Sequence, residues 1–134
     1  MLLTAIDRKT QKRFSIQLED GQHFYLGRKP DPEVASKHSG QKDMVALALG
    51  AVDGTISRTH AWGVRQGNLL VVHRIMPIEG AVTPHPLFSI FGERQQLPDV
   101  ITLELGQAFG IHPDGFVEFH WVANDEQISQ PSIM

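Results

Sequence analysis

The strongest constraint on the fold is a series of short runs in which polar and apolar residues alternate, with turn signals between them. Alternation with a period of two is typical of a half-buried β-strand, because successive side chains of a strand point to opposite faces of its sheet. The runs occupy residues 2–6, 13–18, 23–26, 61–65, 68–73, 100–105, 107–111 and 116–122. Many short strands separated by regular turns predict an all-β sandwich or barrel.

Two of the connections carry residues typical of tight hairpins. Asp20-Gly21 lies between the second and third runs, and Gln66-Gly67 lies between the fourth and fifth. Both favour hairpins, since glycine adopts the positive φ angles that such turns need. The apolar run 44–49 fits either a strand or a helical turn. Residues 87–91 form the one plausible strand in segment 74–99, which holds four of the eight prolines.

Residues 29–43 show no core periodicity and contain Pro30, Pro32 and Gly40. We therefore expect a long surface loop here. Loops of this length inside a compact domain are usually functional or disordered. The loop carries basic side chains that either keep it solvated or contact a ligand: Lys29, Lys37, His38 and Lys42.

Composition narrows the function classes. The 134 residues fit one domain, placed at 1–122, with a polar tail at 123–134. The absence of cysteine excludes disulfides, thiolate metal sites and cysteine nucleophiles, and it fits a reducing cytoplasm, which is the expected location. No run approaches the roughly 18 apolar residues of a membrane-spanning helix, so no membrane partner is expected. A formal net charge of -3 argues against a nucleic-acid partner, because general nucleic-acid binders are usually basic.

Two polar clusters adjoin predicted strands and could meet in space. One is Tyr25-Leu26-Gly27-Arg28, and the other is Ile56-Ser57-Arg58-Thr59-His60-Ala61. If both lie at the same end of a sandwich, Arg28, Ser57 and Arg58 can converge on one anion. The planar guanidinium can form two hydrogen bonds to a phosphate, and serine adds a neutral donor. A phosphorylated side chain offers about -1.5 to -2 charges and three acceptor oxygens.

These residues and their spacing resemble a known family, the forkhead-associated (FHA) domains. Gly27-Arg28 matches the family's Gly-Arg after an early strand, and Ser57-Arg58-Thr59-His60 matches its Ser-Arg-x-His signature. Leu105-Gly106, Phe109-Gly110-Ile111 and residues 116–121 are similar to its closing strands. The resemblance runs from residue 2 to about residue 122.

The resemblance implies an FHA-like β-sandwich of about eleven short strands, with long loops at one end that bind phosphothreonine peptides. Arg28 and Ser57 would hold the phosphate, with Arg58 as a helper. Gly27 would have a structural role, and His60 would brace the loop internally. The implied function is that of an adaptor in signalling or assembly, with a phosphorylated protein or peptide as partner and no cofactor.

The sequence departs from the family at one binding position. FHA domains usually carry Asn-Gly after the strand that corresponds to residues 68–73, and Glu79-Gly80 stands at the comparable place here. The family's asparagine binds peptide backbone, whereas an ionised glutamate cannot donate a hydrogen bond. Glu79 is therefore a candidate peptide-binding position with altered chemistry. An alternative function is a phosphate-independent interaction domain within a larger complex.

Other chemistries are less well supported by the pattern, which favours a binding domain over an enzyme. Ser57 and His60, three apart on an extended segment, would point to opposite faces and lack a third orienting group. The histidines considered as metal ligands show no recognised spacing: His60, His73, His85, His112 and His120. The aromatic residues fit strand or core positions better than a stacking platform for bases: Trp62, Phe116, Phe119 and Trp121. Thr59 is expected on a surface loop.

Overall fold

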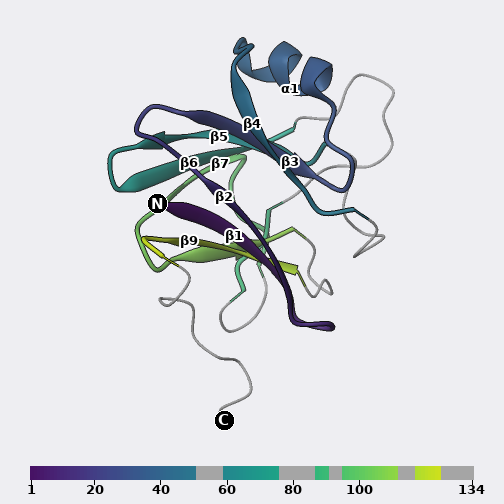
Figure 1. Ribbon diagram of the computed structural model, residues 1–134, viewed down its shortest axis with the longest axis vertical. Helices are drawn as coiled ribbons and strands as arrows, with labels where there is room; N and C mark the ends of the chain where they lie inside the picture. Colours follow the sequence, from purple (N-terminus) through teal and green to yellow (C-terminus); the bar gives the residue numbers. More distant parts are fainter. Residues whose placement is uncertain (51–58, 76–86, 91–94, 112–116, 125–134) are drawn as a thin grey trace.

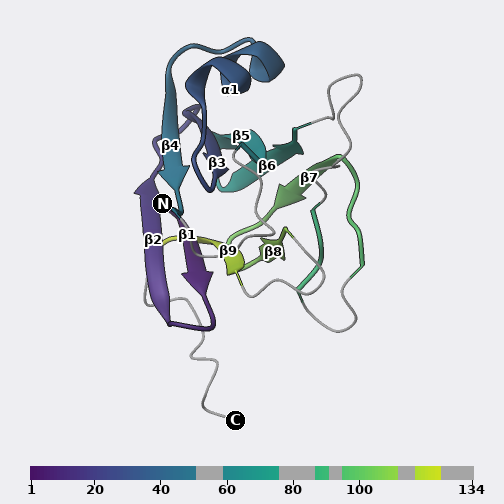
Figure 2. The same cartoon turned by 90° about the vertical axis from the view of Figure 1, so that its right-hand side faces the viewer.

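In the part of the chain that the computed structural model describes, two β-sheets pack face to face, with one short helix on the outer side of one of them (Figure 1). The structure describes residues 1–50, 59–75, 87–90, 95–111 and 117–124. Figure 2 shows the two layers from the side. Among these residues the four-stranded sheet has the order β2-β1-β9-β8 and the five-stranded sheet has the order β4-β3-β5-β6-β7.

The four-stranded sheet is antiparallel throughout and is built from both ends of the chain. Its strands are β1 (Leu2–Asp7), β2 (Lys12–Gln17), β8 (Ala108–Gly110) and β9 (Val117–Val122). Beyond β8, Phe88 forms single bridges with Gly110 and with Gln96, so two further segments extend this sheet. The described residues thus hold nine strands in two sheets, which confirms the predicted β-sandwich.

The five-stranded sheet contains one parallel pair, β3 with β4. Its strands are β3 (His23–Gly27), β4 (Met44–Ala48), β5 (Ala61–Gln66), β6 (Leu69–Arg74) and β7 (Val100–Leu103). The run 44–49, for which the sequence allowed either a strand or a helical turn, forms strand β4. Gly67, at φ 63°, closes the β5–β6 hairpin and confirms the turn predicted there.

The core lies between the sheets and receives the inward-pointing residues of both. On β1 these are Leu3 and Ala5, and they alternate with outward-pointing Thr4 and Ile6. The largest side chains that are fully buried in this core include Phe24, Phe109, Phe119 and Trp121. Burying an aromatic or large aliphatic side chain contributes about 1.5–3 kcal/mol, so the interior supplies most of the stabilisation. The strand or core position expected for the aromatic residues is confirmed for Phe119 and Trp121, which lie on β9 and are buried.

The prediction of a continuous surface loop at residues 29–43 is wrong, because the chain forms helix α1 (Pro32–Ser39) there. The Asp31 carboxylate caps the helix by accepting a hydrogen bond from the Glu33 N–H at 2.9 Å, and Pro32 occupies the first turn. Gly40, at φ 73°, ends it in the left-handed conformation. With eight residues and one buried side chain, Ala35, the helix is too short to show a helical period in sequence.

The hairpin predicted at Asp20-Gly21 is also wrong. β2 belongs to the four-stranded sheet and β3 to the five-stranded sheet, so this turn joins the two layers. Its hydrogen bonds go to the β5–β6 turn: the Gly21 N–H donates to the Arg65 carbonyl at 2.9 Å, and Asp20 Oδ1 accepts from the Gly67 N–H at 2.8 Å. A local Asp-Gly signal predicts a turn, but it does not determine which strands pair.

No helix among the described residues is long and apolar enough to cross a membrane.

Candidate functional site

The predicted Gly27-Arg28 pair lies where β3 ends, and its backbone is fixed by the neighbouring strand. The Leu49 N–H donates to the Gly27 carbonyl at 3.0 Å, and the Gly50 N–H donates to the Arg28 carbonyl at 2.9 Å. Gly27 is buried and Arg28 is half-buried. Because β3 and β4 are parallel, the segments that follow both strands leave from the same end of the sheet.

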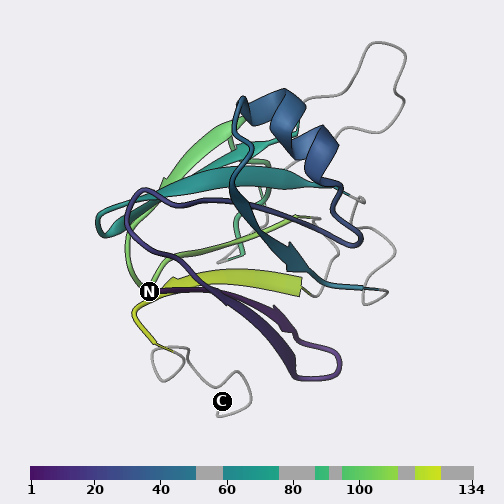
Figure 3. The same cartoon turned by 45° about the horizontal axis from the view of Figure 1, so that its top comes forward.

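The segment that enters β5 lies against the other side of the same backbone. The His60 N–H donates to the Leu26 carbonyl at 2.8 Å, and Thr59 Oγ1 accepts a hydrogen bond from the Asp31 N–H at 2.8 Å. Thr59 is buried, with 6% of its surface exposed, so the surface position expected for it is wrong. We name this edge of the sandwich the loop end; it comprises residues 27–31, 49–50 and 59–60 and the β1–β2 turn at 8–11 (Figure 3).

The Arg28 side chain forms no hydrogen bond or ion pair with any residue that the structure describes. Next to it, Lys29, Pro30, Asp31 and Pro32 line a shallow cavity of about 270 Å³. A half-buried guanidinium without such a partner has the chemistry to receive an anion.

The other predicted site residues divide into two groups. His60 is 1% exposed, and its carbonyl accepts from the Ile75 N–H at 3.1 Å, so it lies inside the base of the loop end. Ser57, Arg58 and Glu79 lie outside the described residues. The roles assigned to all of these residues remain predictions.

A basic turn that sequence reasoning did not select lies at the same end. It joins β1 to β2 and is organised by Asp7, whose side chain is buried. Asp7 Oδ1 accepts from the backbone N–H groups of Lys9 (2.9 Å) and Thr10 (3.3 Å), and its Oδ2 accepts from the Thr10 hydroxyl at 2.9 Å. Gln11 adopts φ 63° and its N–H donates to the Asp7 carbonyl at 2.7 Å. The turn is therefore preorganised, and it presents Lys9 and Lys12 to solvent.

Arg8 ties this turn to the next strand of the sheet. Its Nε and Nη2 each lie 2.8 Å from Glu118 Oε1 on β9, and His120 Nε2 lies 3.0 Å from the same oxygen. Burial raises the pKa of Glu118, but the hydrogen bonds from His120 and Arg8 outweigh it, and the net pKa is below the usual value. The carboxylate therefore stays ionised and holds Arg8 in place.

The described residues contain no group of three His, Asp or Glu side chains that could hold a metal ion. His73 instead stacks on Trp62 across β5 and β6, with ring centroids 4.0 Å apart. Burial lowers the pKa of His73. His85 and His112 lie outside the described residues.

Comparison with solved structures finds the same fold in the FHA domain of the CT664 protein from Chlamydia trachomatis. The two chains share 18% sequence identity over 92% of this chain and 96% of that one, with a TM-score of 0.55. No protein-family model matches the sequence, and the comparison with curated proteins finds no match. The likeness shows an FHA-like fold and confirms the predicted fold class.

Proposed function

We propose that this FHA-fold domain is a phosphothreonine-dependent peptide-binding module, an adaptor without catalytic activity, and that it binds its ligand at the loop end. The observation that carries the proposal is the position of Arg28. Its backbone is held by Gly50 on one side, and Leu26 and Asp31 on either side of it bond to His60 and Thr59. Its side chain has no partner among the described residues.

This arrangement suits a phosphate because the backbone is ordered before the ligand arrives. An arginine on a fixed strand end loses less conformational entropy on binding than one on a free loop. A charge-assisted hydrogen bond contributes about 1.5–3 kcal/mol, and a guanidinium can make two of them to one phosphate. Arg28 alone can therefore separate a phosphorylated peptide from its unphosphorylated form by a large factor.

The proposal assigns the second phosphate contact to Ser57 and a helping contact to Arg58. Chain connectivity supports this assignment, since Ser57 is two residues from Thr59 and two residues span at most about 7 Å. Thr59 in turn bonds to Asp31, three residues beyond Arg28. The short link from Ser57 to Thr59 therefore supports the proposed contact of Ser57 with the phosphate.

We propose that Glu79 weakens binding to the peptide backbone, because it stands where the family's asparagine makes hydrogen bonds to that backbone. Two like charges about 4 Å apart repel by about 1 kcal/mol in water, and by about 4 kcal/mol at an effective dielectric near 20. That repulsion is comparable to one arginine–phosphate hydrogen bond. A Glu79→Asn variant is therefore expected to bind phosphopeptides more tightly than the parent.

The test is titration calorimetry with a peptide library that has a central phosphothreonine and with the same library carrying threonine. We expect binding to the phosphorylated library alone, and a loss of about 10-fold or more in Arg28→Ala and in Ser57→Ala. Arg28→Lys keeps the charge but not the planar fork, so it should fall between the parent and Arg28→Ala.

Arg65→Ala is the matched control, because it removes a guanidinium from the opposite end of the sandwich and should leave phosphopeptide affinity unchanged. Unaltered affinity in both Arg28→Ala and Ser57→Ala would end the proposal. Equal affinity for the two libraries would favour the phosphate-independent interaction domain instead.

A further inference from the structure

The lysines and arginines of this chain are unevenly distributed. Of 12 in total, four lie within residues 8–13, although the chain has a formal net charge of -3. They belong to the β1–β2 turn and the start of β2: Arg8, Lys9, Lys12 and Arg13. A third of the positive charge is thus concentrated in one hairpin of an acidic protein.

The turn holds these cations in a fixed arrangement. Asp7 anchors the backbone from inside, and the Gln11 amide donates to the Arg8 carbonyl at 2.8 Å. Arg8 forms an ion pair with Glu118, whereas the side chains of Lys9 and Lys12 are exposed at the tip of the turn. The hydrogen bonds to Asp7 and Thr10 come from the backbone N–H groups of Lys9 and Lys12, so substitution of the two side chains leaves these donors in place.

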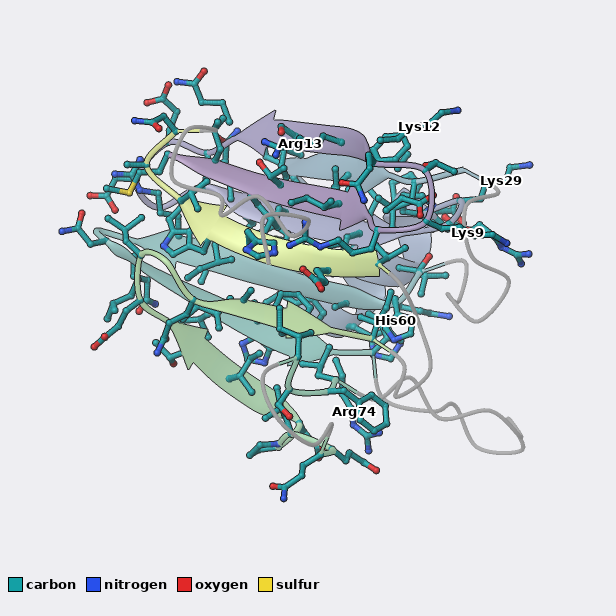
Figure 4. The ribbon with its side chains drawn as sticks, turned by 90° about the horizontal axis from the view of Figure 1, so that it is seen from below. Lys9, Lys12, Arg13, Lys29, His60 and Arg74 are labelled. Atoms are coloured by element: carbon teal, nitrogen blue, oxygen red, sulfur yellow. The ribbon has the colours of Figure 1, made fainter. Side chains whose placement is uncertain are left out.

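The turn reaches the end of the molecule where Arg28 lies. Figure 4 shows Lys9, Lys12 and Lys29 at one end, and Figures 1 and 3 place the β1–β2 turn and the β3–α1 connection on the same side. The turn comes from the four-stranded sheet and Lys29 from the five-stranded sheet. Cations of both sheets therefore lie on the side of the sandwich where the chain leaves β3 at Arg28.

The described carboxylates at this end are mostly engaged with their own surroundings. Asp7 is buried in the turn, Glu118 is paired with Arg8 and His120, and Asp31 caps α1. Glu33, in the first turn of α1, is exposed. Among the residues that the structure describes, the exposed charge around the β1–β2 turn is therefore positive, and the chemistry it complements is a carboxylate-rich segment.

We propose that Lys9 and Lys12 of the β1–β2 turn select phosphopeptides that carry acidic residues beside the phosphothreonine. This inference rests on the proposed function and adds a specificity determinant to it. An exposed lysine–carboxylate pair strengthens binding by about twofold to fivefold, and the gain falls as salt rises. Two lysines together give a preference of about 10-fold at low salt.

The test compares two phosphothreonine peptides at low salt, one with three glutamates on each side of the phosphothreonine and one with glutamines at those positions. We expect the parent protein to prefer the acidic peptide by about 10-fold, and the preference to shrink at high salt. The double variant Lys9→Glu/Lys12→Glu should lose or reverse this preference and bind the glutamine peptide within about twofold of the parent. Lys9→Gln/Lys12→Gln should show an intermediate loss.

Lys37→Glu/Lys42→Glu is the matched control, since it makes the same charge change beside α1 and should keep the preference. An acidic preference that survives in Lys9→Glu/Lys12→Glu would overturn the inference while leaving phosphate recognition intact. Failure of the parent to bind either phosphopeptide would overturn both. Binding of a single-stranded RNA or of anionic vesicles through these lysines, without any preference for the acidic peptide, would also overturn it.

Discussion

The two ends of the sandwich use arginine in opposite ways. At the end formed by the turns at residues 18–22 and 66–68, Arg65 donates from Nε to the Gly67 carbonyl at 2.7 Å and from Nη1 to the Leu18 carbonyl at 2.8 Å. Its guanidinium therefore joins two turns of the protein itself. At the loop end, Arg28 has its backbone fixed and its side chain without a partner among the described residues.

The difference shows that one arginine can stabilise the fold while another is available to bind a ligand. A guanidinium that satisfies backbone carbonyls stabilises the native state, because its removal leaves those acceptors without a donor. A guanidinium whose donors remain unused within the described structure adds little to folding and keeps its hydrogen bonds for a ligand. The same side chain should then give opposite results at the two ends.

The largest expected effect is on stability at the Arg65 end. Arg65→Ala removes two hydrogen bonds from a charged donor and should lower the free energy of unfolding by about 2 kcal/mol. Arg28→Ala should change it by less than about 0.5 kcal/mol, as is usual for surface substitutions. Urea denaturation followed by tryptophan fluorescence measures both. Equal losses of stability in the two variants would break the comparison.

A smaller effect is expected from Asp7, which shows that the loop end also contains structural groups. Asp7→Ala leaves the N–H groups of Lys9 and Thr10 without their acceptor and should cost about 1–2 kcal/mol of unfolding free energy. Asp7→Asn keeps an acceptor oxygen and should cost about half as much. The same urea titrations measure the loss, and a larger cost in Asp7→Asn than in Asp7→Ala would contradict this account of the turn.

Much of the fold follows from the sequence because alternation is a direct consequence of strand geometry. The runs around Leu3, Phe24 and Phe119 predicted strands that the structure contains. α1 was not predictable in this way, because a helix with Ala35 as its one buried residue has no apolar stripe. The layer change at Asp20-Gly21 depends on hydrogen bonds to a turn more than 40 residues away in sequence, and local turn chemistry does not encode it.

The candidate site was predictable only in part. Gly27-Arg28 could be selected because a strand ending in glycine and arginine is a local pattern. The structure joins the two clusters by the hydrogen bond from the His60 N–H to the Leu26 carbonyl, and the roles of these residues stay predictions. The basic β1–β2 turn was missed because its cations, Lys9 and Lys12 among them, belong to no motif. The sequence signal for this turn was a local density of positive charge in an acidic chain. That density indicates a binding surface only when the topology places the turn at the loop end.

The smallest expected effect concerns the ion pair between Arg8 and Glu118, and it appears as a dependence of the unfolding free energy on pH. The pKa of Glu118 is below its usual value of 4.5 in the folded protein, so its ionised form stabilises the fold above that value. As pH falls through the folded pKa, the carboxylate is protonated and this contribution disappears. Between pH 7 and pH 3 the parent should therefore lose more unfolding free energy than Glu118→Gln does, by no more than about 1 kcal/mol. Urea titrations of both proteins across this range measure the difference. If the unfolding free energy of the two proteins fell by the same amount with pH, Glu118 would not hold the basic turn electrostatically. Asp7 would then be the carboxylate that orders the turn.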